Sequence, residues 1–380
     1  MSKYEYLSNT QLGEALRQYL AFLESRGLNS RTEEVPVTDA LGRVSACAAY
    51  ARRSSPHYTA CAMDGIAVLA KRTFGATQTT PVSLREDEFV RVDTGDPLPQ
   101  GCDAVIMIED CVEEADGVVL RSAAAPWQHV RQIGEDLSAG DMILPSYIEI
   151  EPALIGALLA GGVQKIGVLA KPRVAIIPTG DEIVSQGEIP REGEIPEFNS
   201  AIFCAMLARW GAAGVVYPVV KDDPAKIEQS LRQAASESDL VLLCAGTSAG
   251  RDDGTASAIR ALGDVCVHGI AIRPGKPAVL GAVGNKPVVG VPGYPVSGII
   301  VLEELVKPVI DRLLKREREI TESVCVKMGR RYVSSLKYRE FVRATLGFDA
   351  EGSLSAVPIQ AGAGVITSLT KADCILDVPQ

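Results

Sequence analysis

The sequence predicts a multidomain protein in which a doubly wound α/β domain is joined to β-rich regions. Three observations predict this fold class. In the second half of the chain, apolar runs suited to buried parallel strands alternate with helical segments. Short apolar runs broken by glycine, aspartate and proline fill residues 35–150. Strand-like runs return after residue 321, which indicates a further β region at the end of the chain.

The first half of the chain is expected to hold two helices. Leucine and tyrosine side chains recur at helical spacing on one face of residues 10–26, with Thr10 as the expected N-cap and Gly27 as the stop. A second helix is expected over residues 152–159, because proline suits a helix start and a glycine pair ends the segment. Between the two helices, the apolar runs that suggest strands include residues 104–108 and 118–120.

The α/β region is the most regular part of the sequence, and its elements can be assigned in order. Asparagine or serine at 199–200 is the expected cap of its first helix, and Pro224 is the expected start of the second. The expected strands are residues 174–177, 215–220, 240–243, 265–272 and 287–291, and the expected helices are 200–211, 224–236, 254–262 and 295–315. In the last region, the expected strands include residues 341–345 and 364–368.

Composition excludes several classes of protein. A chain of 380 residues has room for roughly two to three domains, and 47% hydrophobic with 23% charged residues excludes disordered and fibrous proteins. No run of about 18 apolar residues is free of charge, and the N-terminal segment does not read as a secretory signal, so we expect a cytoplasmic protein without a membrane span. The net charge of −10 argues against recruitment of nucleic acid or an anionic membrane.

The cysteines and histidines do not suggest a structural metal or disulfide framework. The nine cysteines never occur as CxxC, and the three histidines do not cluster near them. Cys61 has only His57 nearby in the sequence, so a buried structural cysteine is preferred to a nucleophile.

Polar, glycine-rich segments follow five of the expected strands. In an open parallel sheet, ligands bind outside the carboxyl ends of the strands, so these segments should converge at one edge. A site that binds a small molecule is therefore expected there. The five segments are Pro178-Thr179-Gly180-Asp181-Glu182, Lys221-Asp222-Asp223-Pro224, residues 245–253, Arg273-Pro274-Gly275-Lys276-Pro277, and Pro292-Gly293-Tyr294-Pro295-Val296-Ser297.

The chemistry of these segments suits a phosphorylated ligand. A loop with glycines at 246 and 250 can offer backbone N–H groups to an anion, and Arg273 and Lys276 add positive charge. Carboxylates are the ligands that Mg²⁺ prefers. No GxGxxG follows a strand and no P-loop lysine is present, which disfavours NAD enzymes and P-loop ATPases. The residues concerned are Gly246, Thr247, Ser248 and Gly250 in the loop, and Glu182, Asp222 and Asp253 as the carboxylates.

Each segment alone has a simpler interpretation. The Gly-Thr-Ser-Gly loop is more often a tight turn, and Asp222-Asp223-Pro224 is most simply a helix N-cap with proline at the first helical position. Their coincidence at one sheet edge favours a site. Three segments of the β-rich region are also turn-like, and no spacing argument ties them to that edge: Ala62-Met63-Asp64-Gly65, Asp93-Thr94-Gly95-Asp96-Pro97 and Gly134-Glu135-Asp136.

Taken in order, these segments resemble the molybdopterin molybdotransferases, the MoeA and gephyrin E-domain family. Any one of them is weak, but the ordered set extends over nearly the whole chain and is highly specific. The segments that carry the resemblance are Ala62-Met63-Asp64-Gly65, Thr94-Gly95 with Pro97 and residues 99–105, Gly134-Glu135-Asp136, Thr179-Gly180-Asp181-Glu182, Arg273-Pro274-Gly275-Lys276-Pro277, and Pro292-Gly293 with Pro295-Val296-Ser297.

The resemblance implies a homodimer whose chain has four parts. A linker region of one helix plus strands is expected over residues 1–50 and 141–171, and an inserted β domain over residues 51–140. A three-layer, doubly wound molybdopterin-binding domain is expected over residues 172–318, and a small C-terminal β domain over residues 319–380. The sequence ends before the last strand that the resemblance implies, so a fragment of a longer or fused polypeptide is left open.

The resemblance also implies the reaction, in which molybdate is inserted into adenylylated molybdopterin with release of AMP and with help from Mg²⁺. Glu182 and Asp136 resemble the acidic residues near molybdate and metal, and Asp64 and Thr94 resemble catalytic positions supplied by the inserted domain of the partner protomer. A molybdopterin adenylyltransferase is the implied upstream donor. The residues implied to bind substrate are Thr179, Gly180, Asp222, Gly246, Thr247, Ser248, Gly250, Asp253, Arg273, Lys276, Pro292, Pro295 and Ser297.

The chain departs from the family pattern in ways that suggest a divergent subfamily. Ala245 replaces a glycine, Tyr294 replaces an asparagine, and Arg273 stands where lysine is more usual, which keeps the charge but changes the donor geometry. Tungstate as the oxyanion is left open. So is a second function class, a non-catalytic scaffold or sensor that binds molybdopterin without turnover.

Overall fold

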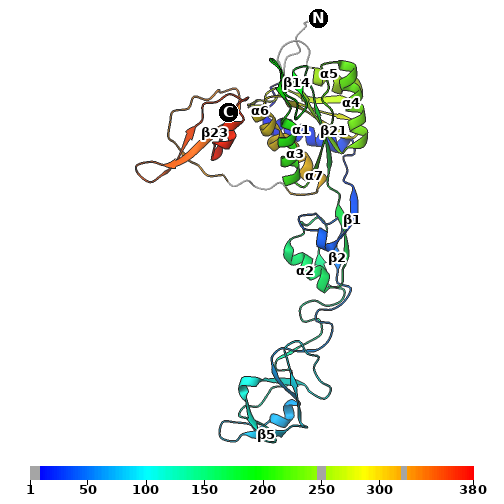
Figure 1. Ribbon diagram of the computed structural model, residues 1–380, viewed down its shortest axis with the longest axis vertical. Helices are drawn as coiled ribbons and strands as arrows, with labels where there is room; N and C mark the ends of the chain where they lie inside the picture. Colours follow the sequence, from blue (N-terminus) through cyan, green and yellow to red (C-terminus); the bar gives the residue numbers. More distant parts are fainter. Residues whose placement is uncertain (1–8, 246–253, 318–322) are drawn as a thin grey trace. The chain divides into compact units, whose positions relative to one another are not determined.

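The computed structural model describes residues 9–245, 254–317 and 323–380 (Figure 1). The chain divides into two compact units: residues 33–168 form one, and residues up to 32 together with those from 169 onward form the other. Among the described residues, no helix is both long enough and apolar enough to cross a membrane.

The second unit is built on a six-stranded sheet. The first four strands in the spatial order are mutually parallel, whereas β20 is antiparallel to both of its neighbours. This confirms the predicted doubly wound domain and adds β20, a strand that the sequence interpretation missed. The spatial order is β16 (Ala213–Val216), β13 (Arg173–Pro178), β17 (Leu240–Ala245), β21 (Lys286–Pro292), β20 (Val279–Val283) and β18 (Asp264–His268).

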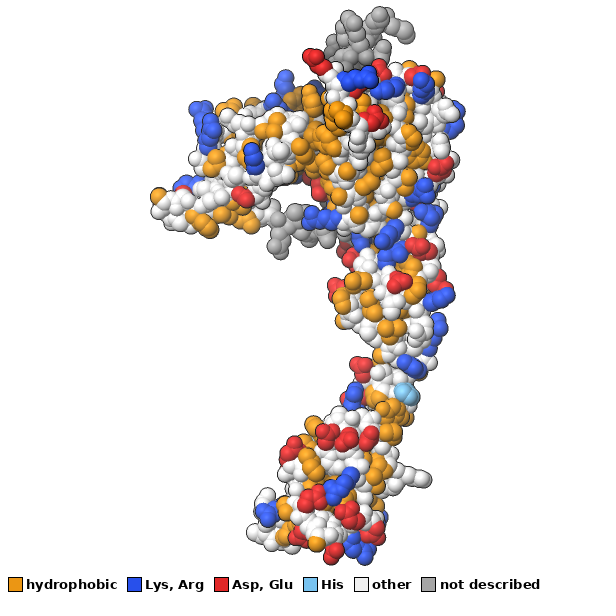
Figure 2. Space-filling view, in the orientation of Figure 1, with side chains coloured by type: hydrophobic (Ala, Val, Ile, Leu, Met, Phe, Trp, Pro, Cys, Tyr) orange, Lys and Arg blue, Asp and Glu red, His pale blue; other side chains and the backbone are white. Residues whose placement is uncertain are grey.

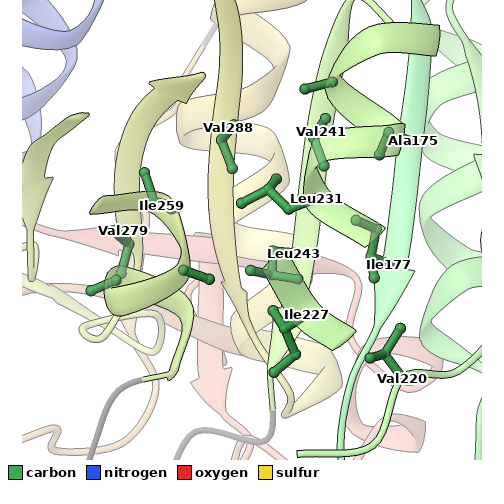
Figure 3. Close-up of a cluster of buried hydrophobic side chains, with 14 residues drawn as sticks. Ala175, Ile177, Val220, Ile227, Leu231, Val241, Leu243, Ile259, Val279 and Val288 are labelled. Carbon is green, nitrogen blue, oxygen red and sulfur yellow. The ribbon is translucent and has the colours of Figure 1, made fainter. Parts of the chain in front are cut away.

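Helices cover both faces of this sheet. On one face, α4 (Pro224–Glu237) and α5 (Gly254–Leu262) pack apolar side chains against the strands, and Leu231 and Leu243 are fully buried in that layer (Figure 3). Each such side chain contributes about 1.5–3 kcal/mol by its removal from water. On the other face, α3 (Asn199–Arg209) and α6 (Pro295–Val301) contact β13 and β21, and α1 (Leu12–Ser25) lies against β18 and β20.

Two predicted helix caps are wrong. Thr10 does not cap α1, because its backbone forms a bridge to Ile270, and Gln11 precedes the helix without a side-chain cap. Neither Asn199 nor Ser200 caps α3, since the helix already begins at Asn199. The carboxylate of Glu197 accepts the Ser200 N–H at 2.8 Å and performs the capping function instead.

Several boundaries also differ from the sequence prediction. The strand expected over 215–220 ends at Val216, and Val220 forms only a single bridge with Thr179. The strand expected over 265–272 stops at His268, because β19 (Ile272–Arg273) pairs with a different sheet. The long final helix is continuous but contains a π-helical turn, η4 (Leu302–Val306), before α7 (Lys307–Leu313).

The last region folds as a five-stranded sheet, in agreement with the predicted C-terminal β region. The strand expected over residues 364–368 is wrong, because Val365 is exposed and the short helix α8 (Thr367–Thr370) forms there. β25 pairs with β23 in the antiparallel direction. The strands are β19, β22 (Lys327–Met328), β23 (Arg339–Phe348), β24 (Leu354–Pro358) and β25 (Cys374–Val378).

The first unit, residues 33–168, is β-rich as predicted. One part pairs β1 (Thr32–Pro36) with β12 (Lys165–Leu169), and β2 (Ala49–Tyr50) with β11 (Met142–Leu144), around α2 (Pro152–Ala160) and the 3₁₀ turn η1 (Val37–Asp39). The inserted part contains the sheets β6-β4-β7 and β5-β9-β8 and the pair β10-β3. Its elements are β3 (Ala60–Cys61), β4 (Gly65–Val68), η2 (Ala70–Thr73), β5 (Val82–Arg85), β6 (Phe89–Val92), β7 (Ala104–Met107), η3 (Ile108–Asp110), β8 (Cys111–Glu114), β9 (Gly117–Leu120) and β10 (Val130–Arg131).

Candidate active site

The loop after β13 is hydrogen-bonded to the ends of the neighbouring strands. The N–H and the hydroxyl of Thr179 both donate to the carbonyl of Cys244, at 2.7 and 3.0 Å, and the Gly180 N–H donates to Val220 at 3.1 Å. Thr179 is almost fully buried, so these bonds form away from water. The loop therefore begins from a fixed point at the carboxyl edge of the sheet.

Gly180 brings the Glu182 carboxylate close to this edge. Its φ is +143°, and a Cβ at this position would lie 3.0 Å from Oε2 of Glu182 and 2.9 Å from the Ile183 side chain. Glu182 thus folds back over the glycine, and a larger residue would push it away. This contact gives a physical reason for glycine in the Thr-Gly-Asp-Glu segment.

Three carboxylates gather at this edge. Oδ1 of Asp181 accepts the N–H of Asp222 at 3.2 Å, and the Lys221 ammonium donates to the Asp181 and Ile183 carbonyls at 2.7 and 3.1 Å. Although Asp222 is exposed, partial loss of hydration, followed by the charges of Asp181 and Glu182, raises the pKa of its carboxyl group. The oxygen donors are of the type that binds Mg²⁺. Within residues 9–245, 254–317 and 323–380, however, no three acidic, histidine or cysteine side chains form a metal-binding group.

Of the two predicted cations, Arg273 ends β19 and Lys276 lies in the loop between β19 and β20. β18 runs in the same direction as β21, because β20 is antiparallel to both, so this loop follows a strand end at the same edge. Nη1 of Arg273 lies 3.7 Å from the buried carboxylate of Glu340, and the Lys276 ammonium lies 5.5 Å from the ring centre of Tyr338. Both cationic side chains therefore lie close to residues of the C-terminal β region.

The loop between β21 and α6 completes this edge. Pro292 is paired with Ala245 at the end of β17, and the Asn199 side-chain amide donates to the Gly293 carbonyl at 2.8 Å. Pro295 and Ser297 are buried at the start of α6. The predicted site residues Gly246, Thr247, Ser248, Gly250 and Asp253 lie outside the described residues.

In the other unit, the structure brings Asp64 and Thr94 together. β4 and β6 are antiparallel with Gly65 opposite Val92, which places the residues just beyond these positions side by side. The Thr94 N–H donates to Oδ1 of Asp64 at 2.6 Å, and this bond, with help from the Thr94 side chain, lowers the pKa of the Asp64 carboxyl group. A hollow of about 270 Å³ opens here, lined by Asp64, Gly65, Arg91, Val92, Asp93, Asp96 and Ile108.

Asp136, the third predicted residue of this unit, lies in a different loop. Its N–H donates to the Ser55 carbonyl at 3.1 Å, and its side chain is exposed. Among the described residues, no hydrogen bond joins it to the Asp64–Thr94 pair. Figure 2 shows acidic side chains on the visible face of the inserted part of this unit.

The sequence interpretation missed Arg343, in the middle of β23. Its side chain is buried, with 7% of the residue exposed, and Nη2 donates to the Ala361 carbonyl. Nε is buried without a partner among the described residues, and burial lowers the pKa of the guanidinium. A buried arginine with an unused donor is suited to an oxyanion. The available signal was an arginine inside an apolar strand.

Comparison with known proteins extends over both units. Three family models match consecutive segments: "MoeA N-terminal region (domain I and II)" over residues 10–162, "Probable molybdopterin binding domain" over 175–312, and "MoeA C-terminal region (domain IV)" over 326–380. Molybdopterin molybdenumtransferase 2 of Mycobacterium tuberculosis is 32% identical, covering 91% of this chain and 90% of its own length. The chain belongs to the MoeA family.

A solved structure agrees with this assignment. The crystal structure of a MoeA molybdopterin biosynthesis protein from Pyrococcus horikoshii superimposes with a TM-score of 0.83 at 32% identity, covering 97% of this chain and 94% of that one. Molybdopterin molybdenumtransferase of Haemophilus influenzae is 30% identical over 77% of this chain and 75% of its own length. The predicted family resemblance and the MoeA-like multidomain fold are therefore confirmed.

Proposed function

We propose that this protein inserts molybdate into adenylylated molybdopterin and releases AMP. The observation that carries the proposal is the carboxyl edge of the six-stranded sheet, where the Thr179–Glu182 loop, Asp222 and Pro292 are held by strand pairing and hydrogen bonds. Relatives at 30% identity or more are named molybdopterin molybdenumtransferases, which supports the same reaction.

The positive side chains are proposed to hold the anionic substrates. Arg273 and Lys276 lie on either side of Pro274 and Gly275, and Arg343 in the adjoining sheet has a buried Nε without a partner in the part of the chain that the structure describes. Fixed cations and N–H donors stabilise both an oxyanion and a phosphoanhydride without reorganisation during the reaction. On this proposal, molybdate exchanges one oxide for the two dithiolene sulfurs, and that oxide leaves as water with the two thiol protons. Hydrolysis of the phosphoanhydride gives AMP and leaves the other phosphate on the pterin. The described residues proposed to bind substrate are Thr179, Gly180, Asp222, Arg273, Lys276, Pro292, Pro295 and Ser297.

The acidic residues are proposed to hold Mg²⁺ and to handle protons. From the family resemblance, Glu182 and Asp136 are each proposed as acidic residues that would bind Mg²⁺, whose charge would offset that of the phosphates. Asp64 and Thr94 act in catalysis, with Asp64 kept ionised by its bond from Thr94. The raised pKa makes the Asp222 carboxylate a better proton acceptor than an ordinary aspartate.

We also propose a homodimer that receives its substrate from a molybdopterin adenylyltransferase in the cytoplasm. The family resemblance of the motifs supports the dimer, in which Asp64 and Thr94 serve the partner's site. All nine cysteines are free thiols, which supports a reducing compartment.

The test is AMP release from adenylylated molybdopterin with Mg²⁺, measured with molybdate, with tungstate and with neither. Release that depends on an oxyanion would support the transferase and rank the two metals. Binding of the adenylylated pterin without release under any condition would overturn the proposal in favour of a non-catalytic scaffold. A control without Mg²⁺ tests the metal requirement separately.

A further inference from the structure

The turn that carries Thr94 is fixed by backbone bonds on one side. Its Gly95 N–H donates to the Cys61 carbonyl at 2.9 Å, and the Cys61 N–H donates back to Asp96 at 2.8 Å. The Asp93 N–H is bound by the Asp96 carboxylate at 3.0 Å. The Asp96 N–H also donates to the Asp93 carbonyl at 3.1 Å, so these bonds use the N–H groups of the turn, whereas the Gly95 carbonyl takes its hydrogen bond from a partner outside the turn.

That partner is Tyr58. Its hydroxyl donates to the Gly95 carbonyl at 2.8 Å, and its ring meets the His57 ring edge-on, with 4.9 Å between centroids and 87° between planes. Tyr58 is 37% exposed and belongs to none of the buried apolar clusters of this unit. Water could satisfy the same carbonyl, so the bond adds little to folding. What it does add is a defined orientation of the Thr94–Gly95 turn.

We propose that Tyr58 is a positioning residue that holds the Thr94–Gly95 turn, and with it the Thr94–Asp64 pair, in the arrangement used for the reaction. The inference rests on the proposed function, in which Asp64 and Thr94 act on the substrate. Tyr58 itself touches the turn and not the reacting atoms. Loss of its hydroxyl should let the turn sample other orientations, because one neutral hydrogen bond changes such a population by about three- to tenfold.

The experiment compares Tyr58→Phe with Tyr50→Phe as a matched control. Tyr50 lies in β2 of the same unit and is 55% exposed, so its substitution also removes one phenolic hydroxyl. Each variant is measured in three ways: the thermal midpoint, hydrogen–deuterium exchange of the peptide that covers residues 93–97, and kcat and KM for AMP release with molybdate.

For Tyr58→Phe we expect about three- to tenfold faster exchange at residues 93–97 and a similar fall in kcat, with KM for molybdate within twofold and the thermal midpoint unchanged. The Tyr50→Phe control should match the wild type throughout. Unchanged exchange would overturn the inference whatever the activity, and faster exchange with unchanged kcat would overturn it as well. Failure of the wild type to release AMP would refute the proposed function instead, so the two failures are distinguishable.

Discussion

The two edges of the six-stranded sheet hold aspartates in opposite electrostatic conditions. At the amino edge, Asp239 accepts two bonds from Arg31 at 3.1 and 2.7 Å and one from the Arg173 N–H at 2.8 Å, with Lys286 at 3.8 Å. At the carboxyl edge, Asp222 faces Asp181 and Glu182. Burial raises the pKa of Asp239, but the hydrogen bonds and the nearby positive charges outweigh burial, so the pKa is lowered overall. The pKa of Asp222 is raised instead.

This difference separates a structural carboxylate from one suited to function. Asp239 has its countercharges within the chain and adds to stability, because a charge that is paired and hydrogen-bonded is favoured in the folded state. The carboxylates of the other edge repel one another, which costs stability unless a cation or proton joins them. The same residue type therefore contributes to stability at one edge and to function at the other, and four tests examine this contrast.

The largest effect is expected at Glu182, which folds over Gly180 at the carboxyl edge. Glu182→Gln should reduce AMP release by about 10²- to 10⁴-fold, because it removes a charge from the metal or from proton transfer. The thermal midpoint should stay near that of the wild type, since the side chain is only partly buried. Glu188→Gln, in the exposed segment after the short strand β14 (Ile183–Val184), is the control and should retain full activity.

A loss of folding in Glu182→Gln, or turnover equal to that of Glu188→Gln, would argue against a role in the reaction. The thermal midpoint and steady-state AMP release distinguish these results from the expected one.

The second effect is on stability at the amino edge. Asp239→Asn should lower the free energy of unfolding by about 2 kcal/mol at pH 7, because charge-assisted bonds are replaced by weaker ones. The Asp239 side chain is only 13% exposed, so screening by water is limited. AMP release at a temperature well below unfolding should be unchanged.

The pH dependence of this loss has a definite sign. The folded pKa of Asp239 lies below the unfolded value of about 3.9, so its stabilisation is present above that pH and is lost as pH falls through the lowered pKa. The wild type and Asp239→Asn should therefore converge in urea unfolding at low pH. A difference that stayed constant with pH would contradict the assignment of the stabilisation to the carboxylate.

The third test applies one substitution in both units. Thr179→Val removes a buried hydroxyl that donates to Cys244, so it should cost about 1 kcal/mol of stability. Thr94→Val removes an exposed hydroxyl and should leave stability within about 0.5 kcal/mol while reducing AMP release. Denaturant unfolding and kinetics on both variants check this, and equal destabilisation would contradict the distinction between the two threonines.

How far the sequence could predict these sites depends on the range of the contacts. Thr179, Gly180, Glu182 and Asp222 follow strand ends, so strand periodicity and the rule for parallel sheets were enough to group most of them. Pro224 likewise marked the start of α4. Such features are local or follow from topology.

The remaining features need tertiary pairing that one sequence does not contain. Asp64 and Thr94 become neighbours only through the antiparallel register of β4 and β6, so their motifs looked like separate turns. The sequence interpretation assigned parallel strands that alternate with helices. It therefore missed β20, which is antiparallel to its neighbour β21. Arg343 was read as part of a strand, because its burial depends on the sheet around it.

The smallest expected effect returns to Asp222, where the sign is the reverse of that at Asp239. Its folded pKa is raised, so the ionised group is disfavoured on folding at neutral pH, and this cost disappears as pH falls below the unfolded pKa. Asp222→Asn should raise the thermal midpoint by about one degree at pH 7, since an exposed substitution changes stability by at most about 0.5 kcal/mol.

The gain should vanish near pH 3, because both proteins then carry a neutral side chain at residue 222. Calorimetric melting at the two pH values, with the exposed Asp87→Asn as a control, measures it. A lower midpoint for Asp222→Asn at pH 7 would mean that its carboxylate is paired within the chain as Asp239 is. The contrast between the two edges would then fail, and with it the argument that the carboxyl edge keeps unpaired acids for a ligand.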